Sequence, residues 1–205
     1  MTPGRIVLAT KNPDKEFEMR AVLARVLPAV EIVSGLTWED VPETGETLED
    51  NAVLKARAVA AATGLAALAD DTGLEVEALG GAPGVNTARY AGPAATYADN
   101  RVALLAVLAG VSDRRARFRT VVALAWNGVV ITAAGSVGGT IALAERGSGG
   151  FGYDPIFEVD GRTLSELGTA AKNTFSHRAR ALEALARLLV LGDEAPGRTH
   201  GGGVP

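Results

Sequence analysis

The segment ARFRTVVALAWNGVVITAAGSV, residues 116–137, decides the fold class. It contains two runs rich in β-branched and apolar residues, and the dipeptide Asn127-Gly128 joins them. Asn-Gly between two such runs is the strongest short-range signal of a β-hairpin, so we expect two antiparallel strands. Shorter β-type runs occur at residues 5–10, 65–76 and 156–159. Because helical patterns separate these runs, the sequence predicts an α/β fold with a mixed sheet.

Four segments have the pattern of amphipathic helices. Residues 13–27 repeat apolar side chains at helical spacing and follow Asn12, a residue type that caps helix N-termini well. Pairs with the spacing of a capping box begin the next two helices, which we expect over residues 47–64 and 96–110. We expect the last helix to begin near Ser176 and to carry leucines along one face.

Length and composition are typical of a globular protein of one domain, or of two small lobes that share a core. The 205 residues are 47% apolar and 21% charged, with a net charge of −4. There is no cysteine, which excludes disulfides and cysteine zinc sites and fits a reducing compartment. No apolar run reaches the length of a signal-peptide core or a membrane span, so we expect a cytoplasmic protein. Few aromatic residues and no basic block argue against nucleic-acid binding.

The C-terminal segment GDEAPGRTHGGGVP, residues 192–205, is rich in glycine and proline. This composition predicts a disordered tail, so the globular domain should span residues 1–191. His200 lies in the predicted tail, which leaves His177 as the only histidine for chemistry. A catalytic metal would therefore be held by carboxylates, which favours magnesium or manganese.

Two segments are candidates for binding phosphate. TKNPDK, residues 10–15, lies at a predicted strand-to-helix junction, where free backbone N–H groups and the helix dipole attract anions. On spacing alone, an ordinary helix cap with solvated lysines is the favoured interpretation. The second segment is PETGETLEDNAVLK, residues 42–55, in which Asn51 and Lys55 share a helix face. An inward-facing Lys55 would meet a phosphate, although a helical lysine is more often solvated. Glu43, in the loop before this helix, would usually be solvated too.

Two adjacent acids, Asp70 and Asp71, stand inside the apolar run LAALADDTGLEV, residues 65–76. Neighbouring side chains of a strand point to opposite faces, so the two carboxyls should diverge and only one should face any given site. The following Thr72-Gly73 suggests a bend, where a strand end exposes a side chain. A strand-terminating Asx turn and a metal-binding carboxylate are about equally consistent with this pattern.

A glycine-rich loop and a basic segment complete the candidate site residues. In SGGFGYDP, residues 148–155, the glycines would let the backbone approach a ligand while Phe151 stacks on a planar base. The alternative is a tight structural loop with a core phenylalanine. In KNTFSHR, residues 172–178, Arg178 offers fixed donors for carbonyl or phosphate oxygens. A Ser176 helix cap with exposed basic residues explains the same pattern.

Taken in order, six segments of the chain resemble the inosine triphosphate pyrophosphatase family, the house-cleaning enzymes for XTP, ITP and dITP. These segments are TKNPDK, ETGETLEDNAVLKA, ADDTGLEV, LGGAPGVNTARYAG, GGFGYDPIF and KNTFSHRARAL. The resemblance extends from Arg5 to about Leu191. It implies a long, twisted mixed sheet with flanking helices, two lobes around a central cleft, and a homodimer. It also implies Mg²⁺-dependent hydrolysis of a nucleoside triphosphate to the monophosphate and pyrophosphate.

The same resemblance implies roles for individual residues. Asp71 and Glu43 would hold magnesium, and Asp71 would also position or activate the water that attacks the α-phosphorus. Lys55 would help to neutralise the triphosphate, and Thr72 would touch the substrate. The implied triphosphate-binding residues are Thr10, Lys11, Asn12, Pro13, Asp14 and Lys15. The implied base pocket consists of Phe151, Gly152, Tyr153, Asp154, Lys172, His177 and Arg178.

The basic segment also gives a hypothesis for base choice. Donors from His177, Arg178 and nearby backbone N–H groups would bind O6 of hypoxanthine or xanthine. The amino group of adenine would leave those donors unpaired, and such buried mismatches discriminate strongly. Two other functions stay open at this point: a nucleotide-binding sensor without turnover, and a pyrophosphatase for modified pyrimidine nucleotides, as in the related Maf-type fold.

Overall fold

The computed structural model describes residues 2–194, and a mixed sheet of eight strands forms its centre. The strands are β1 (Arg5–Leu8), β2 (Glu31–Val33), β3 (Ala66–Val76), β4 (Pro83–Gly84), β5 (Arg115–Trp126), β6 (Val129–Ile141), β7 (Phe157–Val159) and β8 (Arg162–Thr163). Their order is β2-β1-β3-β5-β6-β7-β8, with β4 also paired to β3. β1 pairs in parallel with β2 and β3, and the remaining pairs are antiparallel. The predicted α/β class with a mixed sheet is confirmed.

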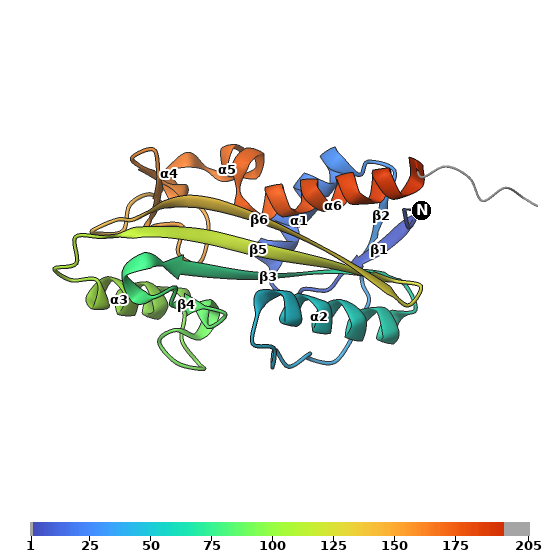
Figure 1. Cartoon of the computed structure of the whole chain (residues 1–205), viewed down its shortest axis with the longest axis horizontal. Helices are drawn as coiled ribbons and strands as arrows, with labels where there is room; N and C mark the ends of the chain where they lie inside the picture. The colour runs from blue at the N-terminus through green and yellow to red at the C-terminus, as the bar shows by residue number, and fades with distance from the viewer. Residues whose placement is uncertain (1, 195–205) are drawn as a thin grey trace, which may run out of the picture.

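The predicted hairpin joins β5 to β6. Trp126 pairs with Val129 across the turn, and both turn residues, Asn127 and Gly128, have positive φ angles of 50° and 78°. Positive φ at both central positions is the geometry that favours Asn-Gly in two-residue hairpins. The long strands β3, β5 and β6 run through the length of the molecule and connect its two ends (Figure 1).

The helices are α1 (Pro13–Val26), α2 (Leu48–Thr63), α3 (Tyr97–Val107), α4 (Leu164–Leu167), α5 (Thr169–Phe175) and α6 (His177–Glu194), with short 3₁₀ turns at Glu77–Leu79 and Thr87–Arg89. The four predicted helices (α1, α2, α3 and α6) begin at or next to their predicted caps, and the structure adds two short helices, α4 and α5, that the sequence analysis did not predict. Asn12 caps α1, and complete capping boxes begin α2 at Thr47 and α3 at Thr96. Gly64 ends α2 in the left-handed conformation, as its position predicts. Within residues 2–194, no helix is long and apolar enough to cross a membrane.

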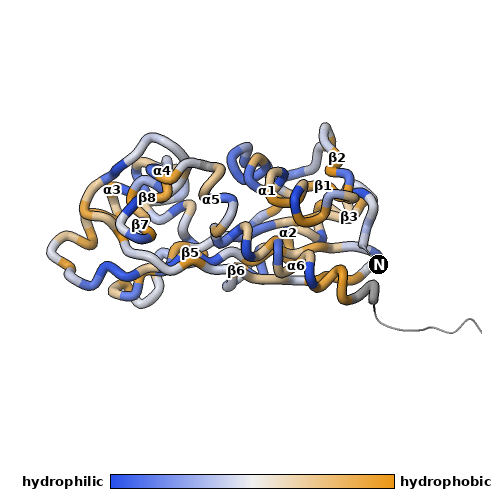
Figure 2. Tube along the Cα trace, turned by 90° about the horizontal axis from the view of Figure 1, so that it is seen from above, coloured by the Kyte–Doolittle hydropathy of each residue, from blue (hydrophilic) through white to orange (hydrophobic). Residues whose placement is uncertain are grey.

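Helices cover both faces of the sheet (Figure 1). On one face, α1 and α6 bury a core that includes Met19, Leu68 and Leu182. On the other face, small residues such as Ala52 of α2 pack closely against the strands. A third core lies at the N-terminal end of β5, next to α3, α4, β7 and β8. These elements lie at the opposite end of the molecule from α1, β1 and β2 (Figure 2). The sheet therefore links two groups of helices, and the candidate site draws residues from both.

Two predictions about the chain path are wrong. The strand does not bend at Thr72-Gly73, because β3 continues to Val76 and stays paired with β5 throughout. A Cβ at Gly73 would lie 2.9 Å from the carbonyl oxygen of Gly84, so this glycine permits close approach of β4. The predicted tail also begins too early, since α6 continues to Glu194 through Gly192. One glycine inside a helix weakens it by only about 1 kcal/mol and does not end it. Residues 195–205, the rest of that tail, lie outside the described residues.

Candidate active site

A pocket lies where β1, α1, α2, β3, α3 and the segments 151–154 and 172–178 meet. All but two of the predicted site residues line it. The exceptions are Pro13 and Asp14, which build the start of α1 instead. Pro13 occupies the first helical turn, and the amide of Asp14 donates to Asn12 Oδ1 at 2.9 Å. Their contribution is therefore to the helix N-terminus and not to the pocket wall.

Asp71 forms part of the pocket wall together with α2. Asn51 Nδ2 donates to Asp71 Oδ2 at 3.1 Å, and Lys55 Nζ lies 3.8 Å from Asp71 Oδ1 and 2.5 Å from Glu43 Oε1. Glu43 is therefore paired and not freely solvated. Burial raises the pKa of Asp71, and repulsion from Glu43 raises it further while Lys55 opposes them. Burial opposes the charge on Lys55, but the nearby carboxylates outweigh it and raise the Lys55 pKa, so this cation stays protonated.

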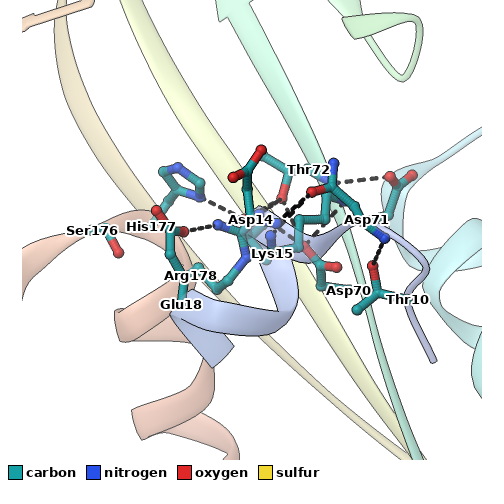
Figure 3. A network of polar contacts seen from close by, with 12 residues as sticks. Thr10, Asp14, Lys15, Glu18, Asp70, Asp71, Thr72, Ser176, His177 and Arg178 are labelled. Atoms are coloured by element: carbon teal, nitrogen blue, oxygen red, sulfur yellow. Dashed lines mark hydrogen bonds and ion pairs between the residues drawn. The ribbon is translucent and has the colours of Figure 1, made fainter. Parts of the chain in front are cut away.

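Asp70 has a separate set of partners on the opposite face of β3 (Figure 3). Its Oδ2 accepts from Nε and Nη2 of Arg178 at 3.2 and 3.0 Å, and Lys15 Nζ lies 3.3 Å away. Burial alone would raise the pKa of Asp70, but Lys15, Arg178 and Lys55 hold it well below its usual range. Asp70 is only 1% exposed and does not line the pocket. The expectation that the two acids point apart agrees with these contacts.

Glu18, a residue that the sequence analysis missed, pairs with Lys172 and Arg178, two basic residues that line the pocket. It is 3% exposed, and its carboxylate contacts Arg178 Nη1 and, at 2.7 Å, Lys172 Nζ. Lys172 also bonds to Asp154 Oδ2 at 2.6 Å. A signal was present, because Glu18 adjoins Met19 on the apolar face of α1, where an acid needs a buried partner.

The loop 148–154 places Phe151 at the pocket. Its acidic residue, Asp154, stabilises the loop conformation. Asp154 Oδ2 accepts the backbone N–H of Phe151 at 2.9 Å as well as the Lys172 ammonium. Gly150 has a φ of 75°, and a Cβ there would lie 2.2 Å from Asp154 Oδ2. Lys172 Nζ stands 4.6 Å from the centroid of the Phe151 ring. Tyr153 is buried and donates to Thr87 O at 3.0 Å, so it packs mainly in the core.

The chain is similar to known proteins over nearly all of its length. The model of the Ham1 family matches residues 6–188. The chain belongs to the Ham1 family. A dITP/XTP pyrophosphatase from Symbiobacterium thermophilum is 48% identical over 95% of this chain and 100% of its own length, and one from Elusimicrobium minutum is 47% identical over 89% and 98%. The solved structure of the Staphylococcus aureus Ham1 protein has a TM-score of 0.82 and 37% identity, and covers 93% of this chain and 100% of its own.

Within this Ham1-family pocket, the carboxylate oxygens of Glu43 and Asp71 are of the chemical kind that Mg²⁺ prefers as ligands. No group of three or more His, Cys, Asp or Glu side chains that could hold a metal occurs among residues 2–194. Mg²⁺ commonly takes one or two carboxylates and completes its shell with water and substrate phosphate. The two carboxylates therefore fit a cation shared with a phosphate, and they do not fit a closed protein cage.

Arg178 keeps few donors for a ligand. A guanidinium has five N–H groups. Those on Nε and Nη2 face Asp70 and Thr72, and one on Nη1 faces Glu18. Among the described contacts, this leaves at most one N–H of Arg178 for a bound base. The sequence predicts that Arg178 offers fixed donors to carbonyl or phosphate oxygens, and most of these donors instead bond to Asp70, Thr72 and Glu18.

Several other pocket residues were not found from the sequence. Trp38 and Phe118 lie outside every motif, and Tyr97 appears only as the first residue of a helix. No local pattern distinguishes such residues from ordinary core or surface side chains. The missed lining residues are Ala9, Trp38, Asp40, Val41, Val59, Val85, Thr87, Ala88, Tyr97 and Phe118.

Protonation of His177 should make the stability of this Ham1-family chain fall in mild acid. Burial lowers the His177 pKa well below 6.5, and Arg178 and Lys172 lower it further. Below pH 6.5, His177 binds a proton in the unfolded chain and not in the folded chain. The free energy of unfolding therefore decreases by up to about 1.4 kcal/mol for each pH unit of acidification. Urea unfolding between pH 8 and 5 should show this slope in the wild type and a shallower one in His177→Gln. Parallel curves would contradict a neutral His177.

Proposed function

We propose that this chain hydrolyses the non-standard purine nucleotides XTP, ITP and dITP to the monophosphate and pyrophosphate. The observation that carries this proposal is one pocket that combines a cationic phosphate end, a carboxylate of raised pKa and an aromatic loop. Relatives 47% and 48% identical to this chain are named dITP/XTP pyrophosphatases, which supports the same reaction.

The N-terminus of α1 and two lysines would bind the triphosphate. Asn12 Oδ1 accepts the backbone N–H groups of Asp14 and Lys15, so α1 offers the pocket the positive end of its helix dipole and not free N–H groups. Lys15 is partly buried beside Asp70, and Lys55 is held by Glu43. Phosphoryl-type displacement depends mainly on positioning and charge neutralisation, which is what these groups provide.

Asp71 is the best candidate for the general base. Its raised pKa brings a carboxylate closer to the range that suits proton transfer near neutrality. Asn51 fixes its orientation, since Asn51 Oδ1 in turn accepts the Gly45 N–H at 2.8 Å. Glu43 and Asp71 would hold Mg²⁺, which when bound neutralises phosphate charge. Asp71 would then take a proton from the water that attacks the α-phosphorus.

The base would stack on Phe151 with O6 toward His177. Thr120 Oγ1 lies 2.6 Å from His177 Nδ1 and 2.7 Å from Thr72 Oγ1. For neutral His177 to donate to O6 from Nε2, its Nδ1 must accept the Thr120 hydroxyl, which in turn accepts from Thr72. This arrangement requires the Thr72 hydroxyl to donate to Thr120 and not to Asp70 Oδ2, which lies 3.2 Å from Thr72 Oγ1, and in that state His177 favours a 6-oxo base.

We further propose a cytoplasmic homodimer. The location is supported by the cysteine-free sequence, which suits a reducing compartment. The dimer is supported by the family resemblance described above. Light scattering on the purified chain would measure the oligomeric state directly, and a monomeric mass at micromolar concentration would reject the dimer.

A nucleotide panel tests the proposed reaction. We expect pyrophosphate release from ITP, XTP and dITP that requires Mg²⁺ and is lost with EDTA, and kcat/KM at least tenfold lower for ATP, dTTP and UTP. Tight binding of ITP without release would support the sensor instead. Higher kcat/KM for dTTP or UTP would support a pyrimidine pyrophosphatase of the Maf type. Pyrophosphate and phosphate should be measured separately, because release of orthophosphate would show cleavage at a different bond.

A further inference from the structure

Tyr97 reaches the pocket from α3, an element to which neither the motifs nor the proposed mechanism gives a role. It is the first residue of the helix, and the capping box of Thr96 with Asp99 fixes where the helix begins. The buried Asn100 accepts from Ala91 N–H at 2.8 Å and donates to Ala88 O at 2.9 Å. The backbone that carries Tyr97 is therefore anchored, while its side chain is 39% exposed and lines the pocket.

Asn12, in the segment 10–15 that is proposed to bind the triphosphate, determines how the Tyr97 hydroxyl is oriented. Asn12 Oδ1 accepts two backbone N–H groups at the start of α1, so its amide nitrogen is the atom that faces Tyr97. That nitrogen donates to Tyr97 Oη at 2.6 Å. The phenol oxygen thus serves as an acceptor, and its own hydrogen remains to be donated. Among residues 2–194, the structure gives the Tyr97 hydroxyl no acceptor for that hydrogen.

The base end of the pocket also contacts α3. The Tyr97 and Phe151 rings have centroids 6.0 Å apart with their planes inclined by 43°. One turn further along α3, Arg101 Nη1 donates to Gly152 O at 2.9 Å. Residues four apart lie on the same helix face, so this face of α3 supports the loop that presents Phe151. Tyr97 therefore stands between the aromatic loop and the N-terminus of α1.

We propose that Tyr97 is a substrate-binding residue whose hydroxyl donates a hydrogen bond to a phosphate oxygen of the bound triphosphate. A bound ligand would supply this acceptor, and the hydroxyl adjoins the Asn12 cap, where the dipole of α1 and the side chains of Lys11 and Lys15, which line the same pocket, attract an anion. A phosphate oxygen is the strongest acceptor that a nucleotide can bring there. This inference rests on the proposed function for the identity of the ligand.

The experiment compares wild type with Tyr97→Phe, which removes the hydroxyl and keeps the ring. Binding of tripolyphosphate with Mg²⁺, measured by calorimetry, should weaken about tenfold in Tyr97→Phe, as expected for a lost hydrogen bond to a charged group. KM for ITP should rise by a similar factor with kcat changed less than twofold, since the contact binds substrate and transition state alike. Tyr97→Ala should weaken ITP binding further because it also loses the contact with Phe151.

Val102→Ala is the matched control, because Val102 lies on α3 and is 62% exposed. It should bind tripolyphosphate and ITP like wild type. Equal tripolyphosphate affinity in Tyr97→Phe and wild type would overturn the inference, as would a loss of the same size in Val102→Ala or no tripolyphosphate binding by wild type. Failure of the proposed function has a different outcome: wild type would bind tripolyphosphate and hydrolyse none of the nucleotides.

Discussion

Asp71→Asn should lower kcat/KM for ITP by about 10³-fold, the range in which a lost general base falls. Asp71 lines the pocket beside Asn51, Lys55 and Glu43, and burial raises the pKa of its carboxylate. An asparagine keeps the volume and can still face Asn51, but it cannot accept a proton. Initial rates of pyrophosphate release at saturating Mg²⁺ measure this effect. Calorimetry with ITP should show that binding persists, which separates lost chemistry from lost affinity.

Asp70→Asn, the matched control one residue earlier, should reduce stability strongly and activity only weakly. Asp70 bonds to Arg178 and Lys15, is 1% exposed and does not line the pocket. Removing one partner of a buried pair costs about 3–5 kcal/mol, so the free energy of unfolding should decrease clearly. Activity per folded molecule should decrease far less than in Asp71→Asn, although Arg178 will shift somewhat. Equal losses of activity in the two variants, each corrected for the folded fraction, would refute the asymmetric roles of these acids.

Local patterns explain which parts of the fold were predictable. The Asn127-Gly128 hairpin and the caps at Asn12, Thr47 and Thr96 are decided by residues within a few positions of one another. The continuation of β3 is not local. It depends on pairing with β5, about 50 residues later, and this pairing overrides the turn tendency of Thr72-Gly73.

The difference between local patterns and distant contacts also explains which residues of the candidate site were predicted. Side chains that carry the family motifs were found because their spacing is written in the sequence, and all but two of them line one pocket. Their partners were not found: Glu18 meets Arg178 across 160 positions, and Asn12 meets Tyr97 across 85. Whether a lysine or glutamate is solvated or buried depends on such distant contacts, as Glu43 and Lys55 illustrate.

Lys172→Met should produce one of the largest losses of stability in the molecule. Lys172 is 2% exposed, and its ammonium lies 2.7 Å from Glu18 Oε1 and 2.6 Å from Asp154 Oδ2. Methionine retains much of the apolar stem but leaves both carboxylates buried without this cation. We expect the free energy of unfolding at pH 8, measured with urea, to fall by about 3–5 kcal/mol. Lys11→Met is the control, because Lys11 pairs with Asp40 where both side chains are mainly exposed, and it should change stability little.

The cause of that loss can be tested by removing a second charge. Burial already raises the pKa of Asp154, and Lys172 opposes this rise, so Lys172→Met should raise the pKa further. The folded variant then binds a proton that the unfolded chain releases, and its stability should recover as the pH decreases from 8 to 5. Lys172→Met combined with Asp154→Asn should recover part of the loss at pH 8, because the uncompensated charge is gone. A pH-independent deficit that the second substitution leaves unchanged would assign the loss to packing around Phe151 instead of to charge.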